Sequence, residues 1–242
     1  MDGLSPPAVQ VTCKPGDVVK KYYTLLKQIG AGSYGSIFSA TYRNGQVQKI
    51  VAIKFEMETP EHPFLYNEAL MIQTMSGQNH YAKFYQYGSH MDYKFIAMEL
   101  LGPNMIDIVN RRKPYRFSLK DILKFGIQAI EGLQALHKQG FVHRDIKPGN
   151  FVIGNTKDTA GIFYVIDFGL VKKMNMENGV IVKPTKQGGF RGTLRYASLN
   201  AHLGLELGRQ DDLMSLLYIF IEFCAGNLPW VDCGNRVCYI HY

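Results

Sequence analysis

The sequence predicts an α+β fold in two lobes: a small antiparallel sheet with one helix, followed by a larger, mainly helical lobe. Two observations predict it. Extended β-branched and aromatic runs dominate residues 22–98, whereas helical periodicity dominates residues 104–230. A short connector with Gly and Pro, residues 99–103, separates them. At 242 residues the chain is long enough for both lobes.

The first lobe is expected to contain five strands and one helix, after a loose N-terminal arm at residues 1–21. The extended runs are residues 23–29, 36–42, 48–55, 82–88 and 93–98, and residues 43–45 (RNG) predict a hairpin turn. Residues 62–77 predict the helix, with Pro63 in its first turn and Gly77 at its end. Its apolar face is Leu65, Ala69, Ile72 and Met75.

The second lobe contains two predicted long helices. Residues 118–140 predict an amphipathic helix, with Ser118 and Asp121 as a capping box and Gly140 as its end. Its predicted apolar stripe is Leu119, Ile122, Leu123, Ile127, Ile130, Leu133 and Leu136. Residues 209–226 are apolar on nearly all sides beyond Asp212, which predicts a helix buried inside the lobe.

Composition and charge narrow the class of protein. No signal peptide is expected at the N-terminus, and the longest uncharged apolar stretch of the C-terminal half, LMSLLYIFI, is too short to span a bilayer. The four cysteines form no CxxC pair, which favours reduced thiols in the cytoplasm or nucleus. The net charge of +7 is compatible with nucleic acid, a membrane surface or acidic substrates, and equally with a solvated basic surface.

Three glycines, Gly30, Gly32 and Gly35, have G-x-G-x-x-G spacing. Glycines at this spacing allow backbone N–H groups to approach phosphates closely. A dinucleotide-binding turn would need a strand before them and a helix after them. They lie between two extended runs instead, so the sequence does not favour that type of site.

Lys54 lies in an apolar strand, VAIK, where a lone lysine is most often an exposed edge residue. Among Val51, Ala52, Ile53 and Phe55 its ammonium would need an anionic partner to offset desolvation. Glu68, midway along the next helix, is the expected partner. Glu56, Glu58 and Glu61 are nearer in sequence but are expected to be solvated.

Residues 141–154, FVHRDIKPGNFVIG, bring together groups suited to phosphoryl transfer. The carboxylate of Asp145 can accept a hydroxyl proton, the ammonium of Lys147 can neutralise a phosphoryl group, and the amide oxygen of Asn150 can bind Mg²⁺. Asp167, followed by Phe168 and Gly169, offers a second metal ligand. The alternative for the HRD triplet alone is a loop ion pair between Arg144 and Asp145.

In the order G-x-G-x-x-G-x-I, VAIK, helix Glu, HRDIKPGN and DFG, these motifs resemble those of eukaryotic protein kinases over residues 22 to 230. Ser198-Leu199-Asn200 stands where most kinases have A-P-E. With ELLGPN and GRQDDLMSL, this is similar to the casein kinase 1 superfamily. The segment FRGTLRYASLNAH most resembles its tau-tubulin kinase-like branch.

The resemblance implies ATP and Mg²⁺ as cofactors and a two-lobed protein kinase fold. Lys54 would bind the α- and β-phosphates and pair with Glu68. Asp145 would be the catalytic base, Lys147 would contact the γ-phosphate, and Asn150 and Asp167 would hold Mg²⁺. Thr193 would tie Asp145 to Lys147, and Asp212 would anchor the catalytic loop.

The resemblance also implies an ATP-covering segment and an adenine-binding connector. The covering residues would be Ile29, Gly30, Ala31, Gly32, Ser33, Tyr34, Gly35, Ser36 and Ile37. Met98 would be the gatekeeper, and the backbones of Glu99 and Leu101 would bind adenine.

Lys147, in the K-x-x-N register, implies transfer of the ATP γ-phosphoryl group to serine or threonine hydroxyls of proteins. Basic residues outnumber acidic ones between Asp167 and Asn200, and the resemblance puts an anion near Arg195 and Arg144. We therefore expect acidic or already phosphorylated substrates. A basic solvated loop is the alternative.

The family usually continues with further helices after residue 230, whereas residues 231–242 here have little helical pattern. The helical lobe is therefore expected to be incomplete, with a divergent tail at 231–242. The alternative function is a truncated, weakly active or inactive kinase-like nucleotide-binding or interaction protein. Nucleic-acid binding is disfavoured because no recognition-helix or RNA-binding signature is present. The sequence leaves the oligomeric state open.

Overall fold

A computed structural model describes residues 11–32, 35–57, 64–111, 116–177, 180–181, 189–233 and 239. The chain forms two compact units, one of residues 1–76 and 82–101 and one of residues 77–81 and 102–242. Residues 77–81 lie between two elements of the first unit in sequence but belong to the second unit by their contacts. One of these contacts is the hydroxyl of Tyr81 donating to the carbonyl oxygen of Gly132.

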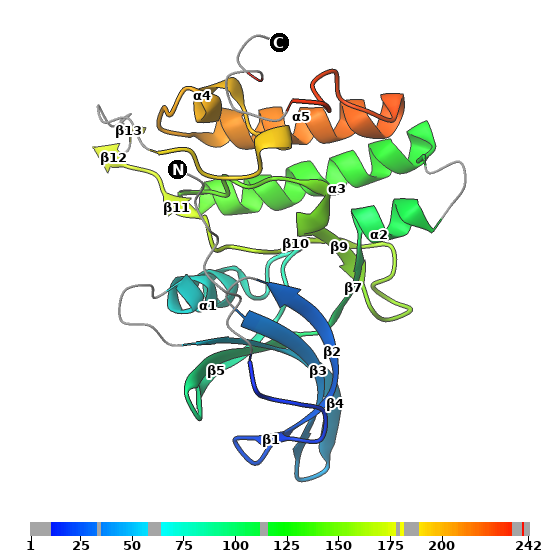
Figure 1. Ribbon diagram of the computed structural model, residues 1–242, viewed down its shortest axis with the longest axis vertical. Coiled ribbons are helices and arrows are strands. Elements are labelled where there is room, and N and C mark those ends of the chain that lie inside the picture. The colour runs from blue at the N-terminus through cyan, green and yellow to red at the C-terminus, as the bar shows by residue number, and fades with distance from the viewer. Residues whose placement is uncertain are drawn as a thin grey trace. The chain divides into compact units, whose positions relative to one another are not determined.

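The first unit contains an antiparallel sheet with strand order β1-β2-β3-β4-β6-β5, drawn in blue to green in Figure 1. Its elements are β1 (Val18–Val19), β2 (Tyr23–Gly32), β3 (Gly35–Asn44), β4 (Val47–Met57), α1 (Phe64–Met75), β5 (Phe84–His90) and β6 (Tyr93–Glu99). The five predicted runs are strands and the hairpin turn between β3 and β4 is present. Strand β1 falls within the predicted loose arm, because the β-branched pair Val18–Val19 adds to the edge of β2.

Alternation along the strands builds the core of the first unit. In β3 the side chains of Ser36, Phe38 and Ala40 are buried on one face, as a period of two requires. Phe38 packs edge-on against Phe55 of β4, which also contacts Phe95 of β6. Three central strands are thereby fixed against one another in a single register.

Helix α1 buries the predicted face, since Leu65, Ala69, Ile72 and Met75 are all buried. Gly77 follows the helix with φ of +91°, a conformation that glycine adopts without a steric penalty. The predicted role of Pro63 lies outside the described residues.

The described part of the second unit is mainly helical and contains three small sheets, in the strand orders β10-β9-β7, β11-β8 and β12-β13. Its strands are β7 (Leu101–Asn104), β8 (Phe141–Val142), β9 (Phe151–Gly154), β10 (Phe163–Val165), β11 (Lys172–Lys173), β12 (Met176–Glu177) and β13 (Val180–Ile181). Its helices are α2 (Met105–Asn110), α3 (Leu119–Lys138), α4 (Leu199–His202) and α5 (Arg209–Ala225), with 3₁₀ turns η1 (Pro148–Asn150) and η2 (Leu194–Tyr196).

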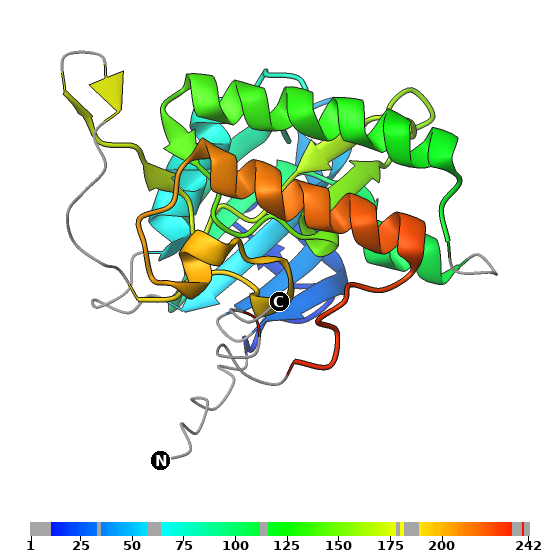
Figure 2. The same ribbon diagram turned by 90° about the horizontal axis from the view of Figure 1, so that it is seen from above.

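Helices α3 and α5 lie side by side and antiparallel, in green and orange in Figure 2. His137 near the end of α3 contacts Asp212 at the start of α5, and Phe117 just before α3 packs on Phe223 near the end of α5. The hydroxyl of Ser118 caps α3 by accepting from the backbone N–H of Asp121, as predicted.

The predicted apolar stripe of α3 is only partly buried. Ile122, Leu133 and Leu136 are buried, but the prediction is wrong for Leu119, Leu123, Ile127 and Ile130, which are 48–65% exposed. Phe125, Gly126 and Ala129 complete the buried face instead. The predicted stripe is wider than the buried face because α3 carries apolar residues beyond the arc that its neighbours cover.

Helix α5 is likewise not buried on all sides. Leu213, Met214, Leu217 and Ile221 are exposed, while Leu216, Ile219 and Phe223 are buried. Among the described residues, no helix is long and apolar enough to cross a membrane.

The cysteines differ in state. Cys13 is buried and Cys224 is exposed, and both are free thiols. Cys233 is disulfide-bonded, so the prediction of four reduced thiols is wrong at this position. Spacing in the sequence does not show which side chains the fold brings within bonding distance.

Candidate functional site

In the first unit the predicted pair forms: the ammonium of Lys54 donates to the carboxylate oxygen Oε2 of Glu68. Strand β4 sets the position of Lys54 by pairing it with Ile37 of β3 and Ile96 of β6. Glu68 is buried on α1, and its side chain is 6% exposed against 23% for Lys54. A carboxylate this buried needs its partner, because an unpaired charge loses its hydration without compensation.

Glu56, two residues after Lys54 on β4, is half-buried and not solvated as predicted. Burial raises the pKa of Glu56, the nearby Lys54 opposes that rise, and Glu68 adds to it. The carboxylates of Glu56 and Glu68 therefore both interact electrostatically with the ammonium of Lys54. The other two candidates, Glu58 and Glu61, lie outside the described residues.

The glycine segment forms the hairpin between β2 and β3, with Gly32 opposite Gly35. A Cβ on Gly35 would lie 1.9 Å from the carbonyl oxygen of Phe55, so only glycine fits at this position, where β3 pairs with β4. The amide of Gln28 donates to the hydroxyl of Ser36 within the hairpin. The hairpin also contains the predicted residues Ile29, Gly30, Ala31 and Ile37, whereas Ser33 and Tyr34 lie outside the described residues.

The predicted adenine-binding residues lie where β6 ends and β7 begins. Met98 and Glu99 end β6, where Met98 pairs with Ala52 of β4. The backbone N–H of Glu99 donates to the carbonyl oxygen of Lys83, and Leu101 begins β7.

In the second unit one buried carboxylate fixes the loop after β8. Asp212, which is 2% exposed, accepts through Oδ2 from the backbone N–H of His143 and through Oδ1 from that of Arg144. The ring nitrogen Nε2 of His137 lies 2.8 Å from the same Oδ2. The predicted anchoring role of Asp212 is confirmed in its geometry.

Asp145, the next residue of this loop, is held from two sides. Lys147 Nζ donates to its Oδ2 at 2.6 Å, and Thr193 Oγ1 donates to its Oδ1 at 2.7 Å. Lys147 Nζ lies 3.3 Å from Thr193 Oγ1, so Thr193 contacts both Asp145 and Lys147, and its role in catalysis stays a prediction. Gly192 brings this segment close, since its φ is +108° and a Cβ would lie 2.7 Å from the carbonyl oxygen of Arg144.

Asn150 and Asp167 are joined through the backbone. The Nδ2 group of Asn150 donates to the carbonyl oxygen of Asp145, which leaves its amide oxygen to accept or to bind a cation. The N–H of Ile166, next to Asp167, donates to the carbonyl oxygen of Asn150. Asp167 itself has a φ of +66°.

The side-chain oxygens of Asn150 and Asp167 fit a divalent cation whose other ligands are not protein side chains. One carboxylate and one amide oxygen are hard ligands of the kind that Mg²⁺ prefers, beside water and phosphate. Within the described ranges, no three His, Cys, Asp or Glu side chains form a group that could hold a metal by themselves. The arrangement therefore suits a metal that arrives with a phosphate ligand.

Arg144 does not pair with Asp145. Its Nε donates to the carbonyl oxygen of Leu170 at 2.7 Å, so the simple loop ion pair is not what the structure contains. Its guanidinium lines a cavity of about 350 Å³ together with Lys172, Gly189, Arg191, Ala201, Leu205, Glu206 and Leu207. Burial lowers the pKa of Arg144, the charge of Arg191 lowers it further, and Glu206 and Asp212 oppose this.

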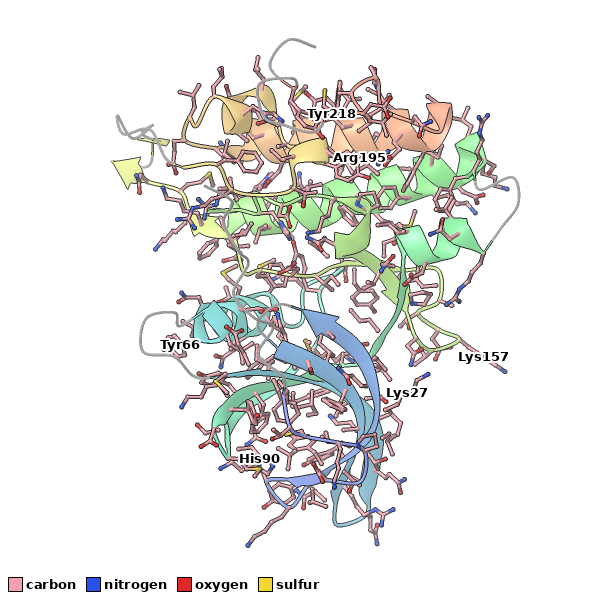
Figure 3. All side chains as sticks on the ribbon, viewed as in Figure 1. Lys27, Tyr66, His90, Lys157, Arg195 and Tyr218 are labelled. Carbon is pink, nitrogen blue, oxygen red and sulfur yellow. The ribbon has the colours of Figure 1, made fainter. Side chains whose placement is uncertain are left out.

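Arg195 lies apart from the residues that line this cavity. Its guanidinium forms an ion pair with Glu222 of α5, which also accepts from the hydroxyl of Tyr196. Figure 3 labels Arg195 on the turn beside α5, and Trp230 donates to its carbonyl oxygen. The two basic residues predicted to bind one anion thus have different surroundings.

Comparison with known proteins decides the family. The family described as protein kinase domain matches residues 23–239 of the chain. The chain belongs to this family. The kinase domain is also similar to a probable serine/threonine-protein kinase of Dictyostelium discoideum, with 40% identity over 215 residues. That match covers 89% of this chain and 43% of the relative, so the chain spans less than half the length of the curated relative it matches.

Sequence reasoning missed three residues of this kinase domain. Lys172 and Arg191 belong to the basic run between Asp167 and Asn200, and their place in the lining of the cavity with Arg144 is not visible in the sequence. Asp211 was overlooked beside Asp212. A doublet of carboxylates at the start of a helix that is otherwise apolar was the available signal, because buried carboxylates need donors.

Proposed function

We propose that this kinase domain is a protein serine/threonine kinase of casein kinase 1 type that uses ATP and Mg²⁺. The proposal rests on the surroundings of Asp145. Its carboxylate accepts hydrogen bonds from Lys147 and Thr193, and the backbone of its loop donates to Asp212. These contacts hold the carboxylate in one orientation, as is required of a group that receives a hydroxyl proton.

The chemistry follows the general course of phosphoryl transfer. The substrate hydroxyl oxygen bonds to the γ-phosphorus as the bond from that phosphorus to the β-phosphate oxygen breaks, and Asp145 takes the hydroxyl proton. Lys147 neutralises charge on the transferred group, and Lys54, held by Glu68, positions the α- and β-phosphates. Asn150 and Asp167 would hold Mg²⁺, which supplies charge stabilisation on the phosphates.

The casein kinase 1 type, and within it the tau-tubulin kinase-like branch, is supported by the residues that replace A-P-E. Ser198 and Asn200 both donate to Oδ1 of Asp211, so the segment Ser198-Leu199-Asn200 has a buried partner of its own. The replacement is therefore an alternative way of fixing the end of the activation segment and not simply a lost motif.

A preference for acidic or phosphorylated substrates is supported by the cavity. Arg144, Lys172 and Arg191 contribute three cations, and Glu206 is the carboxylate among the lining residues. Lys172 forms an ion pair with Glu206, which leaves a net positive lining. Guanidinium groups in such a cavity suit a phosphate or carboxylate of a bound substrate.

The test of the function is phosphorylation of an acidic Ser/Thr peptide by the purified protein with labelled ATP and Mg²⁺, beside Asp145→Asn. We expect a loss of roughly 10²- to 10⁴-fold in the variant, because the proton acceptor is removed. Equal signal from both proteins would refute catalysis by this chain. Thermal shift with ATP and Mg²⁺ would then show whether the domain is a nucleotide-binding module without catalysis.

A further inference from the structure

Asp211 is a buried carboxylate of the second unit, and both of its oxygens accept hydrogen bonds. It is 4% exposed and accepts four hydrogen bonds. Oδ1 accepts from Ser198 Oγ at 2.7 Å and from Asn200 Nδ2 at 2.9 Å. Oδ2 accepts from the backbone N–H of Gly208 at 2.7 Å and from Gln210 Nε2 at 3.0 Å.

These four donors come from the two ends of one segment. Ser198 and Asn200 lie at the start of α4, whereas Gly208 and Gln210 lie at the start of α5. The segment that these donors bound, residues 198–208, contains the four-residue helix α4 and a turn, in which the N–H of Leu205 donates to the carbonyl oxygen of Asn200. A short helix of this kind has little stability of its own. The carboxylate of Asp211 therefore connects the two ends of the segment through hydrogen bonds, an arrangement called the clasp below.

The closed segment forms much of the basic cavity. Ala201, Leu205, Glu206 and Leu207 are four of the eight described residues that line it, beside Arg144, Lys172, Gly189 and Arg191. Two of the lining residues, Glu206 and Lys172, form an ion pair. The position of the segment therefore decides both the width of the cavity and how the cation of Lys172 is held.

The neighbouring carboxylate, Asp212, fixes a different segment. Asp212 accepts from the backbone of the catalytic loop, and its hydrogen-bond partners in the described part of the chain, His137, His143 and Arg144, lie outside residues 198–208. Two consecutive residues at the start of α5 thus hold two separate segments, one that carries Asp145 and one that lines the cavity.

We infer that Asp211 is a positioning residue for substrate selection: it fixes the Ser198–Gly208 segment and so shapes the anion-binding cavity, without acting on phosphoryl transfer. This inference rests on the proposed function, since the cavity is taken as the place where an acidic or phosphorylated substrate is recognised. It assigns selectivity for anionic peptides to a buried carboxylate that itself touches no substrate.

The test compares Asp211→Asn with wild type on two peptides that differ only in acidic or neutral residues around the phosphorylated serine. The amide keeps one acceptor oxygen but turns an N–H₂ toward donors at one end of the segment, which breaks at least one bond to a charged acceptor. We expect KM for the acidic peptide to rise roughly tenfold. KM for ATP, kcat and KM for the neutral peptide should stay near wild type.

Two further variants make the result decisive. Asn200→Ala removes one donor from a partly exposed position, so it should fold even if Asp211→Asn does not, and it should show the same change to a smaller degree. Asp158→Asn, which removes a carboxylate from an exposed loop, is the matched control and should behave as wild type.

Hydrogen exchange gives a readout that does not need activity. In both Asp211→Asn and Asn200→Ala the amides of residues 199–208 should exchange faster, whereas those of residues 141–150 should not change. Unaltered exchange in residues 199–208 of folded Asn200→Ala would overturn the clasp. Altered exchange with unchanged peptide selectivity in an active enzyme would overturn the role in selection. A wild-type protein that phosphorylates neither peptide would instead refute the proposed function, and exchange would still test the clasp.

Discussion

Lys54 in the first unit and Asp145 in the second are both held by side chains of opposite charge, but by different means. Lys54 stands on a central strand whose backbone is paired on both sides, and one carboxylate, Glu68, completes its position. Asp145 stands on a loop and depends on Lys147, Thr193 and, through the neighbouring amides, Asp212.

The difference shows how each kind of secondary structure fixes a functional group. A strand places its side chains through the register of the sheet, so a single ion pair can complete the positioning of a charged side chain. A loop has no register, and its backbone N–H groups need acceptors from elsewhere in the fold. The second unit supplies these acceptors from α5, which makes the site depend on a helix far away in sequence.

The largest effect is expected where the loop loses its acceptor. Asp212→Ala would leave the N–H groups of His143 and Arg144 and the ring of His137 without a buried partner. We expect the free energy of unfolding to fall by about 3–5 kcal/mol and phosphorylation to be lost with it. Chemical denaturation of the purified chain measures the free energy of unfolding. A decrease of less than about 1 kcal/mol would contradict the role given to Asp212.

A smaller effect is expected in the sheet. Lys54→Met should lower the free energy of unfolding by about 1–3 kcal/mol, because Glu68 remains buried without its partner while strand register still holds the backbone. The double variant Lys54→Met with Glu68→Gln should recover part of this loss. A double variant as unstable as the sum of the two single variants would show that the pair contributes no coupling.

The smallest effect concerns Glu56. Its pKa is raised in the folded protein above the ordinary value of 4.5, so folding favours the protonated form. Stability should therefore fall as pH rises from the unfolded value through the folded one, and this cost should be complete at neutral pH. Glu56→Gln should be more stable than wild type at pH 7 but not at pH 4, in thermal unfolding at both values. The same advantage for Asp158→Asn would show that the effect is not specific to Glu56.

Much of the site could be predicted from sequence because its groups are arranged along short segments. Lys54 with Glu68, and Asp145 with Lys147 and Asn150, have spacings that local structure converts directly into geometry. Thr193 and Asp212 are predicted through resemblance alone, since they lie 48 and 67 residues from Asp145. Asp211 was missed because nothing in its local sequence shows which donors the fold brings to it.

Period, turn residues and spacing act locally, so the sequence predicts the five long strands of the first unit, helices α1, α3 and α5 in their order, the glycine at the β2–β3 hairpin and the types of charged group at the site. Tertiary contacts establish which apolar arc of α3 is covered, which acidic residue near Lys54 is half-buried, and which cations line the cavity with Arg144. The physical reason is that burial and pairing depend on neighbours in space, and those neighbours come from segments that the chain brings together only when it folds.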